Sequence, residues 1–332
     1  MKIILHIGTE KTGTTTLQAY LARNQEALAE MGHLYPLSAR DFGPMHAPLV
    51  HIACDDDNLN ELRNWRRLMD KESLHRERVQ LEKNLLDEVA AANPDTLIFS
   101  AEHLSSKLSE DRELERLKVF LGQMSNDFQI VLYVRDQRKL LASSYSEAVK
   151  NGRTSGFKLV LPSDGQSITD AWRARRDATH NVFHMHDPLP FWVDYLALAH
   201  RWARVFGKEN VTVRPFVRAT FRDGDLIGDF FDVTGLPFDP SWPKPQDMNR
   251  SGTPFALLLL RGLNTFLPPT YPRSGRTPKL RVWFRGTRLL NAIPGKVFAL
   301  DTATEAQVAA FFHDDNQRLA EEFMKGDWPG VL

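Results

Sequence analysis

The sequence predicts an α/β protein in which helices flank a central parallel sheet. Two segments support this fold class, because each runs from an apolar strand through a polar turn into a helix; they span residues 1–24 and 128–152. A third apolar run, Thr96 to Ser100, has the length of another buried strand. Short strands that are apolar on both faces are typical of parallel sheets covered by helices on each side. We therefore expect one α/β domain over residues 1–332, with loop insertions.

Composition and charge are those of an ordinary globular protein. The 332 residues are 42% hydrophobic and 25% charged, and neither an internal repeat nor a low-complexity linker is visible. The chain carries 42 basic and 42 acidic residues, so no global field attracts nucleic acid or an anionic membrane. Any anion site must therefore be local, and we expect no nucleic-acid partner.

Targeting and metal signals are weak in this chain. The first residues already form a core strand and lack a signal-peptide pattern, and the longest apolar runs, such as 255–260, are too short to cross a bilayer. The single cysteine, Cys54, excludes an internal disulfide framework and suits a reducing compartment. His46 and His51 have no partners at metal-binding spacing. We expect a cytoplasmic protein without a transmembrane segment or a metal site.

The first strand, loop and helix have the form of an anion site. Met1 to Ile7 is an apolar strand, Gly8 ends it, and leucines recur at helical spacing from Leu17 onward. The helix is expected to begin among Thr14 to Thr16, where hydroxyl side chains favour the first turn. A helix N-terminus offers free backbone N–H groups and roughly half a positive charge. With Lys11 at the tip of the loop, this arrangement predicts a phosphate or sulfate cradle.

The spacing within the loop indicates which anion it binds. A nucleotide triphosphatase loop has the pattern G-x-x-x-x-G-K-[ST], in which the lysine follows the second glycine and the next hydroxyl binds magnesium. Gly8 and Gly13 keep this spacing, but Thr14 stands where the lysine belongs and the cation lies earlier, at Lys11. This favours a phosphate-type ligand held without magnesium. The alternative is a tight turn whose threonines only cap a helix.

A second strand, turn and helix carries another candidate phosphate site. Ile130 to Val134 is a β-branched and aromatic strand, Arg135 ends it, and Ser143 lies eight residues further along in the following helix. A guanidinium grips phosphate with two donors, and a nearby hydroxyl supplies a third. In the alternative interpretation Arg135 is a surface ion-pair partner of Asp136 or Glu147, and Ser143 is an ordinary helix residue.

Together these motifs resemble the sulfotransferases that use 3′-phosphoadenosine 5′-phosphosulfate (PAPS). The run Lys11-Thr12-Gly13-Thr14-Thr15 is similar to their 5′-phosphosulfate loop, and Arg135 with Ser143 to their 3′-phosphate pair. The resemblance implies a P-loop NTPase-like sulfotransferase fold and transfer of a sulfuryl group, without a metal, to a hydroxyl or amine of a small-molecule or carbohydrate acceptor. It also implies a set of donor-binding residues: Lys11, Thr12, Gly13, Thr14, Thr15, Thr16, Arg135, Ser143 and, in a basic C-terminal loop, Arg273 and Arg276.

At one position the sequence departs from the pattern of the cytosolic sulfotransferases. Cytosolic members follow the threonine pair with a tryptophan that packs on adenine, and this chain has Thr16 there. We therefore expect the bacterial or carbohydrate-type branch. Lys11 is expected to act in catalysis as well as in donor binding, because its positive charge would stabilise negative charge that develops on the transferred group.

The group that takes the acceptor's proton is expected just after the strand 96–100. Family members use a histidine or a glutamate at this place, and Glu102 and His103 are both present here. We expect Glu102 to be the base and keep His103 as the second candidate. In the alternative interpretation both residues only cap a helix, because a carboxylate near a helix N-terminus is stabilising in itself.

The remaining segments complete the predicted domain. The donor-binding core would comprise 1–30 and 96–152, with acceptor-side insertions at 34–57 and 153–190 and a helical part from about 250 to 332. We also expect amphipathic helices over 61–92, a strand over 210–216 and a helix over 226–234. Two other functions stay open: a P-loop kinase or nucleotide triphosphatase, and a non-catalytic nucleotide-binding protein of the same fold.

Overall fold

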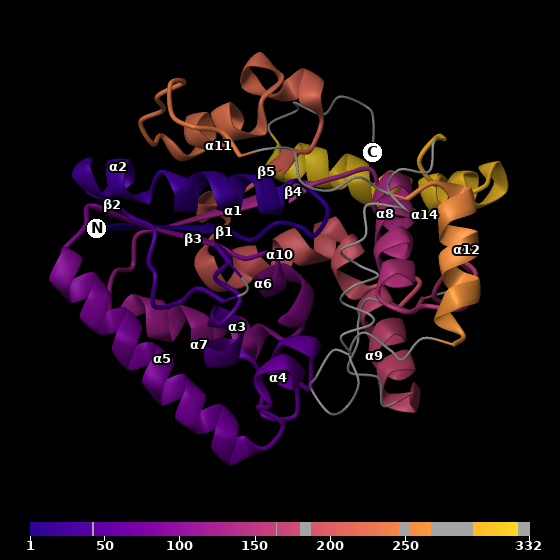
Figure 1. Cartoon of the computed structure of the whole chain (residues 1–332), viewed down its shortest axis with the longest axis horizontal. Helices are drawn as coiled ribbons and strands as arrows, with labels where there is room; N and C mark the ends of the chain where they lie inside the picture. Colours follow the sequence, from indigo (N-terminus) through magenta and orange to yellow (C-terminus); the bar gives the residue numbers. More distant parts are fainter. Residues whose placement is uncertain (42, 164, 180–186, 246–251, 267–294, 325–332) are drawn as a thin grey trace.

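The described part of the chain is built on one parallel sheet. The computed structural model describes residues 1–41, 43–163, 165–179, 187–245, 252–266 and 295–324. Within these ranges five strands pair in the order β2-β3-β1-β4-β5, and every pairing is parallel. The predicted α/β class is confirmed (Figure 1). The strands are β1 (Lys2–His6), β2 (His33–Leu34), β3 (Thr96–Ser100), β4 (Phe128–Val134) and β5 (Val211–Pro215).

The first strand is the centre of the sheet. β1 pairs with β3 on one side and with β4 on the other, so that Ile4 lies opposite both Ile98 and Gln129. The chain thus extends the sheet first to one side of β1 and later to the other, which makes the β1–β4 boundary a topological switch point. Because all strands are parallel, the segments that follow β1, β3 and β4 emerge at the same edge. Ligands of open α/β sheets bind at this kind of edge.

Helices cover both faces of the sheet. Figure 1 shows α1, α2 and α11 on one face and α3, α5, α7 and α10 on the other. The helices are α1 (Thr14–Arg23), α2 (Gln25–Glu30), α3 (Leu49–Ala53), α4 (Glu61–Arg66), α5 (Lys71–Ala92), α6 (His103–Lys107), α7 (Asp111–Gly122), α8 (Gln137–Lys150), α9 (Ile168–Thr179), α10 (Tyr195–Phe206), α11 (Leu226–Thr234), α12 (Pro254–Asn264) and α14 (Thr302–Phe323).

Side chains of β1 point alternately to the two faces of the sheet and pack into two separate apolar clusters. Ile3 and Leu5 belong to the larger apolar cluster, whereas Ile4 packs with Leu17 and Phe230 from the opposite layer. Successive side chains of a strand point to opposite faces, so a fully apolar strand can serve both layers. The strand is therefore held from both sides, and the loop that follows it starts from a fixed point.

Several predicted boundaries agree with the structure. α1 begins at Thr14, β5 spans Val211–Pro215, and α11 spans Leu226–Thr234 before Gly235. The amphipathic stretch 61–92 forms two helices, because Arg67 adopts a left-handed conformation with φ 59° between α4 and α5. Each of these two helices has a side-chain cap at its start.

Two stretches interpreted as loops contain helices. The expected insertion 34–57 includes α3, whose five residues are all buried, and 153–190 includes α9. Ala171 and Trp172 of α9 are buried against the rest of the protein. A short amphipathic pattern inside a polar stretch is weak in sequence and becomes a helix here by packing. No helix in the described ranges combines the length and apolarity needed to cross a bilayer.

Candidate functional site

The loop after β1 turns sharply to place a helix N-terminus at the edge of the sheet. Gly8, Lys11 and Gly13 adopt positive φ angles of 87°, 67° and 76°. Gly13 precedes α1, and no side-chain hydrogen bond caps the start of this helix. The first-turn N–H groups therefore face the loop, as an anion cradle requires.

Hydrogen bonds fix the loop to β4 and to itself. Thr9 donates to the backbone oxygen of Tyr133 through its N–H, at 2.7 Å, and through Oγ1, at 3.2 Å. The buried Thr12 hydroxyl donates to the oxygen of Thr9 at 2.6 Å. Because the hydroxyl of Thr12 already donates within the loop, the group that Thr12 can offer to a ligand is its backbone N–H. Thr14 is buried, whereas Thr15 and Thr16 are half-buried.

Close contacts explain why both ends of the loop are glycine. A Cβ atom on Gly8 would lie 2.7 Å from Cβ of Glu102, and one on Gly13 would lie 2.6 Å from Cδ2 of Leu226. Either contact is shorter than non-bonded carbon atoms tolerate. Side chains at these positions would also be strained by the positive φ angles. The glycine spacing is therefore required by the loop's tight fit between β3 and α11.

Arg135 lies beside the loop, at the end of β4. Its Nη1 donates to the backbone oxygen of Lys11 at 3.0 Å, and its own backbone oxygen accepts from the hydroxyl of Tyr195 at 2.7 Å. Burial lowers the pKa of Arg135, and the guanidinium lies 5.9 Å from the ring centre of Phe216. A half-buried guanidinium held by carbonyl and aromatic groups retains its charge for an incoming anion.

In the alternative interpretation Arg135 pairs with Asp136 or Glu147. Among the described residues no ion pair joins Arg135 to either of these carboxylates. Asp136 pairs with Arg138 at 2.6 Å, and Glu147 pairs with Lys11 at 3.8 Å. Ser143 is 8% exposed and lies in the second turn of α8, the helix that starts directly after Arg135 and Asp136.

Glu102 and His103 follow β3 at the same edge. The Glu102 Oε2 atom accepts a hydrogen bond of 2.7 Å from Nε2 of Gln18, which lies on α1. Glu102 occupies the residue before α6, but its side chain forms no cap bond with that helix. Glu102 thus lies at the N-terminus of α6, as the capping interpretation requires, but without a side-chain cap bond. His103 Nδ1 is buried and has no hydrogen-bond partner among the described residues.

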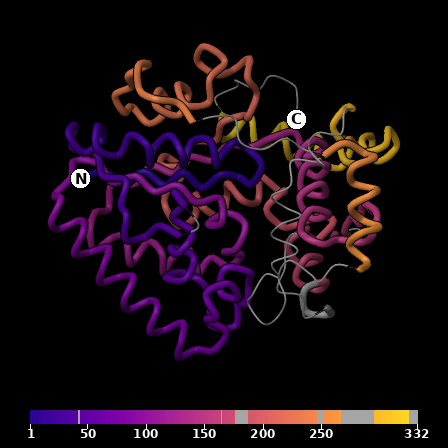
Figure 2. Tube along the Cα trace, in the orientation of Figure 1, coloured from indigo at the N-terminus to yellow at the C-terminus, as the bar shows by residue number. Residues whose placement is uncertain are grey.

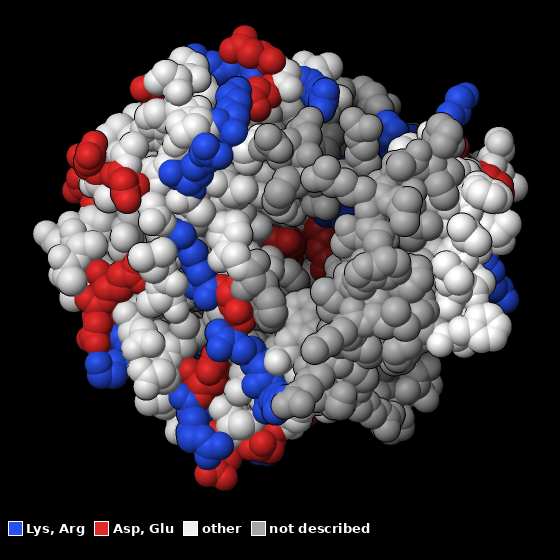
Figure 3. Space-filling view, in the orientation of Figure 1, with Lys and Arg blue, Asp and Glu red and all other residues white. Residues whose placement is uncertain are grey.

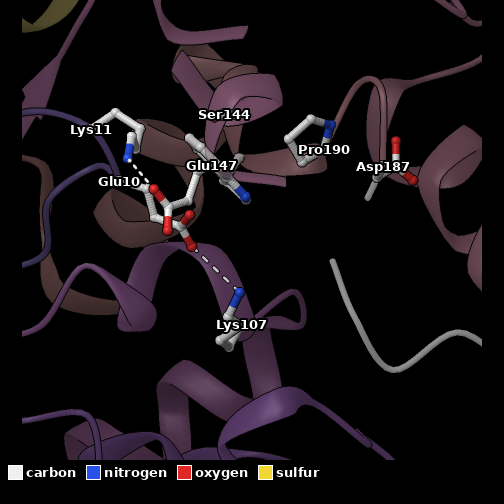
Figure 4. Close-up of a pocket in the computed structure, with 8 residues that line it drawn as sticks. Glu10, Lys11, Lys107, Ser144, Glu147, Asp187 and Pro190 are labelled. Atoms are coloured by element: carbon white, nitrogen blue, oxygen red, sulfur yellow. Dashed lines mark hydrogen bonds and ion pairs between the residues drawn. The ribbon is translucent and has the colours of Figure 1, made fainter. Parts of the chain in front are cut away.

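A pocket opens beside Lys11. It lies between the loop, α6, α8 and the segment before α10, and Figure 4 shows charged side chains of both signs around it. Acidic side chains are also visible within a hollow of the molecular surface in Figure 3. The residues that line the pocket are Glu10, Lys11, Lys107, Ser144, Glu147, Asp187, Pro190 and Trp192.

A buried ion-pair group forms one wall of this pocket. Lys107 is 1% exposed, and its Nζ lies 2.6 Å from Oε1 of Glu61 and 3.4 Å from Oε1 of Glu10. Burial alone would lower the pKa of Lys107, but the two carboxylates outweigh it and raise that pKa. Burial likewise raises the pKa of Glu10, but Lys107, His103, Ser106 and Lys11 together lower it to about 2. Lys107 and Glu10 are therefore ionised at neutral pH.

Most residues of this pocket were not predicted from the sequence. Lys11 alone belongs to both the predicted site and the pocket, while Glu102, His103 and Ser143 are not among the lining residues. Glu10 precedes Lys11, and Glu147 is one helical turn beyond Ser143, so their spacing from the two motifs is the signal that could have found them. Arg273 and Arg276 lie outside the described residues.

The described ranges bring no three His, Cys, Asp or Glu side chains together in a group suited to a metal ion. What the edge of the sheet does offer is a pair of cationic side chains, Lys11 and Arg135, joined at the loop backbone. Beside them lie the free end of α1 and a polar pocket. Such a set suits a ligand with two separate anionic groups.

Comparisons with known proteins give two solved structures. No family model matches the sequence, and no match is found among curated proteins. The chain is similar to a sulfotransferase from Alicyclobacillus acidocaldarius, with 14% identity and a TM-score of 0.45 over 97% of this chain and 95% of that one. It is also similar to a sulfotransferase domain from the curacin biosynthetic pathway, with 12% identity and a TM-score of 0.37 over 94% and 97%. Likeness at this level assigns no family.

Proposed function

We propose that this protein transfers a sulfuryl group from PAPS to a hydroxyl or amine acceptor. The observation that carries the proposal is the hydrogen bond from Arg135 to the backbone oxygen of Lys11, 3.0 Å long. It joins the two segments whose sequences resemble the 5′-phosphosulfate loop and the 3′-phosphate pair of PAPS-dependent enzymes. A donor with anionic groups at both positions would bridge them.

The donor would be held at three places. Its 5′-phosphosulfate would accept from Lys11 and from the backbone N–H groups of residues 12–15 at the start of α1. Its 3′-phosphate would be bound by Arg135 and Ser143, which lie at the end of β4 and in α8. Thr16 would lie where cytosolic PAPS-dependent sulfotransferases place a tryptophan against adenine.

The reaction would be an in-line displacement at sulfur. The acceptor oxygen or nitrogen forms a bond to sulfur, the bond from sulfur to the 5′-phosphate oxygen breaks, and adenosine 3′,5′-bisphosphate leaves with the electron pair. Lys11 would stabilise the charge that grows on the transferred group and the leaving phosphate. This is catalysis by positioning and electrostatics, as in phosphoryl transfer.

Glu102 would take the acceptor's proton, and His103 is the second candidate for this role. Gln18 binds Oε2 of Glu102, which fixes the carboxylate and leaves Oε1 for the acceptor. A base must lie within hydrogen-bond reach of the proton it removes. A Cβ atom on Gly8 would lie 2.7 Å from Cβ of Glu102, so Glu102 is close to the strand end where the donor cradle would begin.

Calorimetric titration without an acceptor tests the proposal. Adenosine 3′,5′-bisphosphate should bind, magnesium ATP should bind much more weakly, and Arg135→Ala should remove most of the bisphosphate affinity. Preference for magnesium ATP would instead indicate a kinase or nucleotide triphosphatase. Binding of neither nucleotide would overturn the proposed donor site.

A further inference from the structure

We propose that α12 docks this protein on a membrane surface that carries anionic lipids. The docking surface consists of an exposed apolar stripe along this helix and of cationic side chains beside it. Figure 1 shows α12, in orange, at one edge of the molecule next to α8. Ser144 and Glu147 of α8 line the pocket beside Lys11. Tyr145 and Val149, on another face of α8, pack against α12. Docking through α12 is therefore independent of the proposed reaction.

The helix is apolar on two opposite sides. One side packs on α8 through Leu257 and Leu260, which are buried. The other side carries Phe255, Leu258 and Leu259, which are 65%, 62% and 46% exposed. Their spacing of i, i+3 and i+4 places these three side chains in one stripe. The packing against α8 thus accounts for only half of the apolar surface of this helix.

Neighbouring residues extend the exposed apolar surface at both ends of α12. Phe266, two residues beyond the helix, is 90% exposed. Val297 is exposed near the start of the helix, because the N–H of the adjacent Phe298 donates to the backbone oxygen of Gly252 at 3.0 Å. Exposed apolar side chains that lie together, rather than scattered singly, mark an interaction surface.

The charged side chains beside the stripe are cationic. Arg261 belongs to α12 itself, and its Nε donates to the backbone oxygen of Thr154 at 3.1 Å. Lys158 is exposed further along the segment that contains Thr154, and Lys296 is exposed next to Val297. The stripe is therefore accompanied by positive charge at its side and at its start.

Acidic residues are absent from the described segments around this helix. No Asp or Glu occurs in 151–163, 252–266 or 295–300. Asp301 comes next in the chain, but its carboxylate caps α14 by accepting from the N–H of Thr304 at 2.9 Å. The whole chain has no net charge, so this local excess of cations is a property of the surface around α12.

This combination favours a membrane over a second copy of the chain. In a symmetric dimer the same surface faces itself, so the cations of the two copies would come together and repel. An anionic bilayer instead offers negative headgroups to the cations and an apolar boundary to the stripe. With 11 residues α12 is too short to span a bilayer, so it would lie along the surface.

Cosedimentation with lipid vesicles tests the proposal. The probes are vesicles of phosphatidylcholine alone and vesicles in which about one third of the lipid is phosphatidylserine. Each lysine or arginine near an anionic surface adds roughly fivefold to binding. Binding to the anionic vesicles should therefore be at least about tenfold tighter than binding to the neutral ones, and should weaken at high salt. Equal binding to both vesicles, or binding to neither, overturns the proposal.

A matched pair of double variants tests the stripe. Leu258→Gln/Leu259→Gln should lower affinity for the anionic vesicles about tenfold, because two side chains no longer leave water. Leu37→Gln/Val119→Gln changes two exposed apolar residues elsewhere and should leave the affinity unchanged. All four positions are exposed, so the variants should fold as the wild type does. Unchanged binding in Leu258→Gln/Leu259→Gln would overturn the proposal.

A second pair tests the cations. Lys158→Gln/Lys296→Gln should remove most of the preference for anionic over neutral vesicles. Lys71→Gln/Lys83→Gln makes the same charge change at exposed positions of α5 and should preserve it. A preference that survives in Lys158→Gln/Lys296→Gln would place the lipid contact elsewhere and overturn the proposal.

Sedimentation velocity without lipid tests the second copy as the occupant. Wild type and Leu258→Gln/Leu259→Gln should have the same oligomeric state. A dimer that this variant dissociates would assign the stripe to self-association and overturn the proposal. None of these measurements involves a nucleotide, so failure of the proposed donor site would leave their outcomes unchanged.

Discussion

Arg135 and Lys11 are joined by a hydrogen bond of 3.0 Å between a guanidinium Nη1 and a backbone carbonyl oxygen, although 124 residues separate them in the chain. The bond connects the end of β4 to the tip of the loop after β1. Figure 2 traces the backbone of the two segments, from the indigo N-terminal part to the purple and magenta middle of the chain. It brings two cationic side chains to one edge of the sheet without bringing their charges into contact. A ligand with two anionic groups can therefore use both.

Arg135→Ala should weaken binding of adenosine 3′,5′-bisphosphate by about 1.5–3 kcal/mol, the usual cost of losing hydrogen bonds to a charged group. Binding of adenosine 5′-phosphate should change much less, because that ligand lacks the 3′-phosphate. Calorimetry with both ligands measures the difference. Arg204→Ala, which breaks an exposed pair with Asp111, is the control. Equal losses for the two ligands would show that Arg135 does not contact the 3′-phosphate.

Lys11→Ala should reduce affinity for PAPS more than affinity for adenosine 3′,5′-bisphosphate, because only PAPS carries the sulfuryl group. Turnover should fall by about two orders of magnitude, the typical result of removing one preorganised donor. Calorimetry with the two nucleotides, followed by an assay of bisphosphate release, checks both statements. Lys83→Ala removes an exposed lysine of α5 and should change neither quantity. Full turnover in Lys11→Ala would exclude the lysine from the mechanism.

Lys107→Met should destabilise the protein by about 3–5 kcal/mol, because it leaves the buried carboxylate of Glu61 and the half-buried carboxylate of Glu10 without their shared cation. Lys83→Met, at an exposed i,i+4 pair with Asp87, should cost less than about 0.5 kcal/mol. Urea unfolding at neutral pH measures both. Addition of Glu61→Gln to Lys107→Met should restore part of the loss. If Lys107→Met is no worse than Lys83→Met, the buried group does not stabilise this wall of the pocket.

Gly13→Ala should be more damaging than Gly235→Ala, although the two glycines have nearly the same backbone conformation. Their φ and ψ angles are 76° and 14° for Gly13, and 71° and 14° for Gly235. Both variants should lose about 1–2 kcal/mol from left-handed strain. A Cβ on Gly13 would additionally lie 2.6 Å from Leu226 and 3.1 Å from Phe216, whereas none of the atoms around Gly235 is within 4 Å.

Displacement of Phe216 by the new Cβ should also disturb the donor site, because the ring of Phe216 lies under the guanidinium of Arg135. Gly13→Ala should therefore also lower affinity for adenosine 3′,5′-bisphosphate. Thermal unfolding and calorimetry on the two variants separate strain from displacement. Equal effects would mean that Leu226 and Phe216 shift without consequence.

His46 should make stability depend on pH. Burial lowers the pKa of His46 to about 3, against 6.5 as its ordinary value, so the folded protein keeps this imidazole neutral. Below about pH 6.5 the unfolded chain binds a proton that the folded chain does not, and stability falls by up to about 1.4 kcal/mol per pH unit from this group. His46→Gln should be less stable at neutral pH but should lose stability less steeply between about pH 6.5 and 5. Urea unfolding across that range shows whether the slope changes.

The ends of the strands and the position of the glycine loop can be predicted from short stretches of the sequence. Apolar runs, the Gly8–Gly13 spacing and the helical leucines after Gly13 fix where β1 stops and α1 starts, because strand, turn and helix propensities act over neighbouring residues. The parallel order then brings the segments after β1, β3 and β4 to one edge. This is why Lys11 and Arg135 were predicted as site residues and lie together in the structure.

Only the tertiary structure decided which side chains share the pocket. Lys107 meets Glu10 and Glu61 across three separate elements, and Lys11 meets Glu147 across the gap between the loop and α8. Such pairs depend on the register and packing of whole helices against the sheet, which no short pattern records. The sequence by itself determined where the glycine loop ends and α1 begins. The packing of α4, α6 and α8 around the loop determined the charges that face it, because burial and partner distance, rather than residue type, set each group's environment.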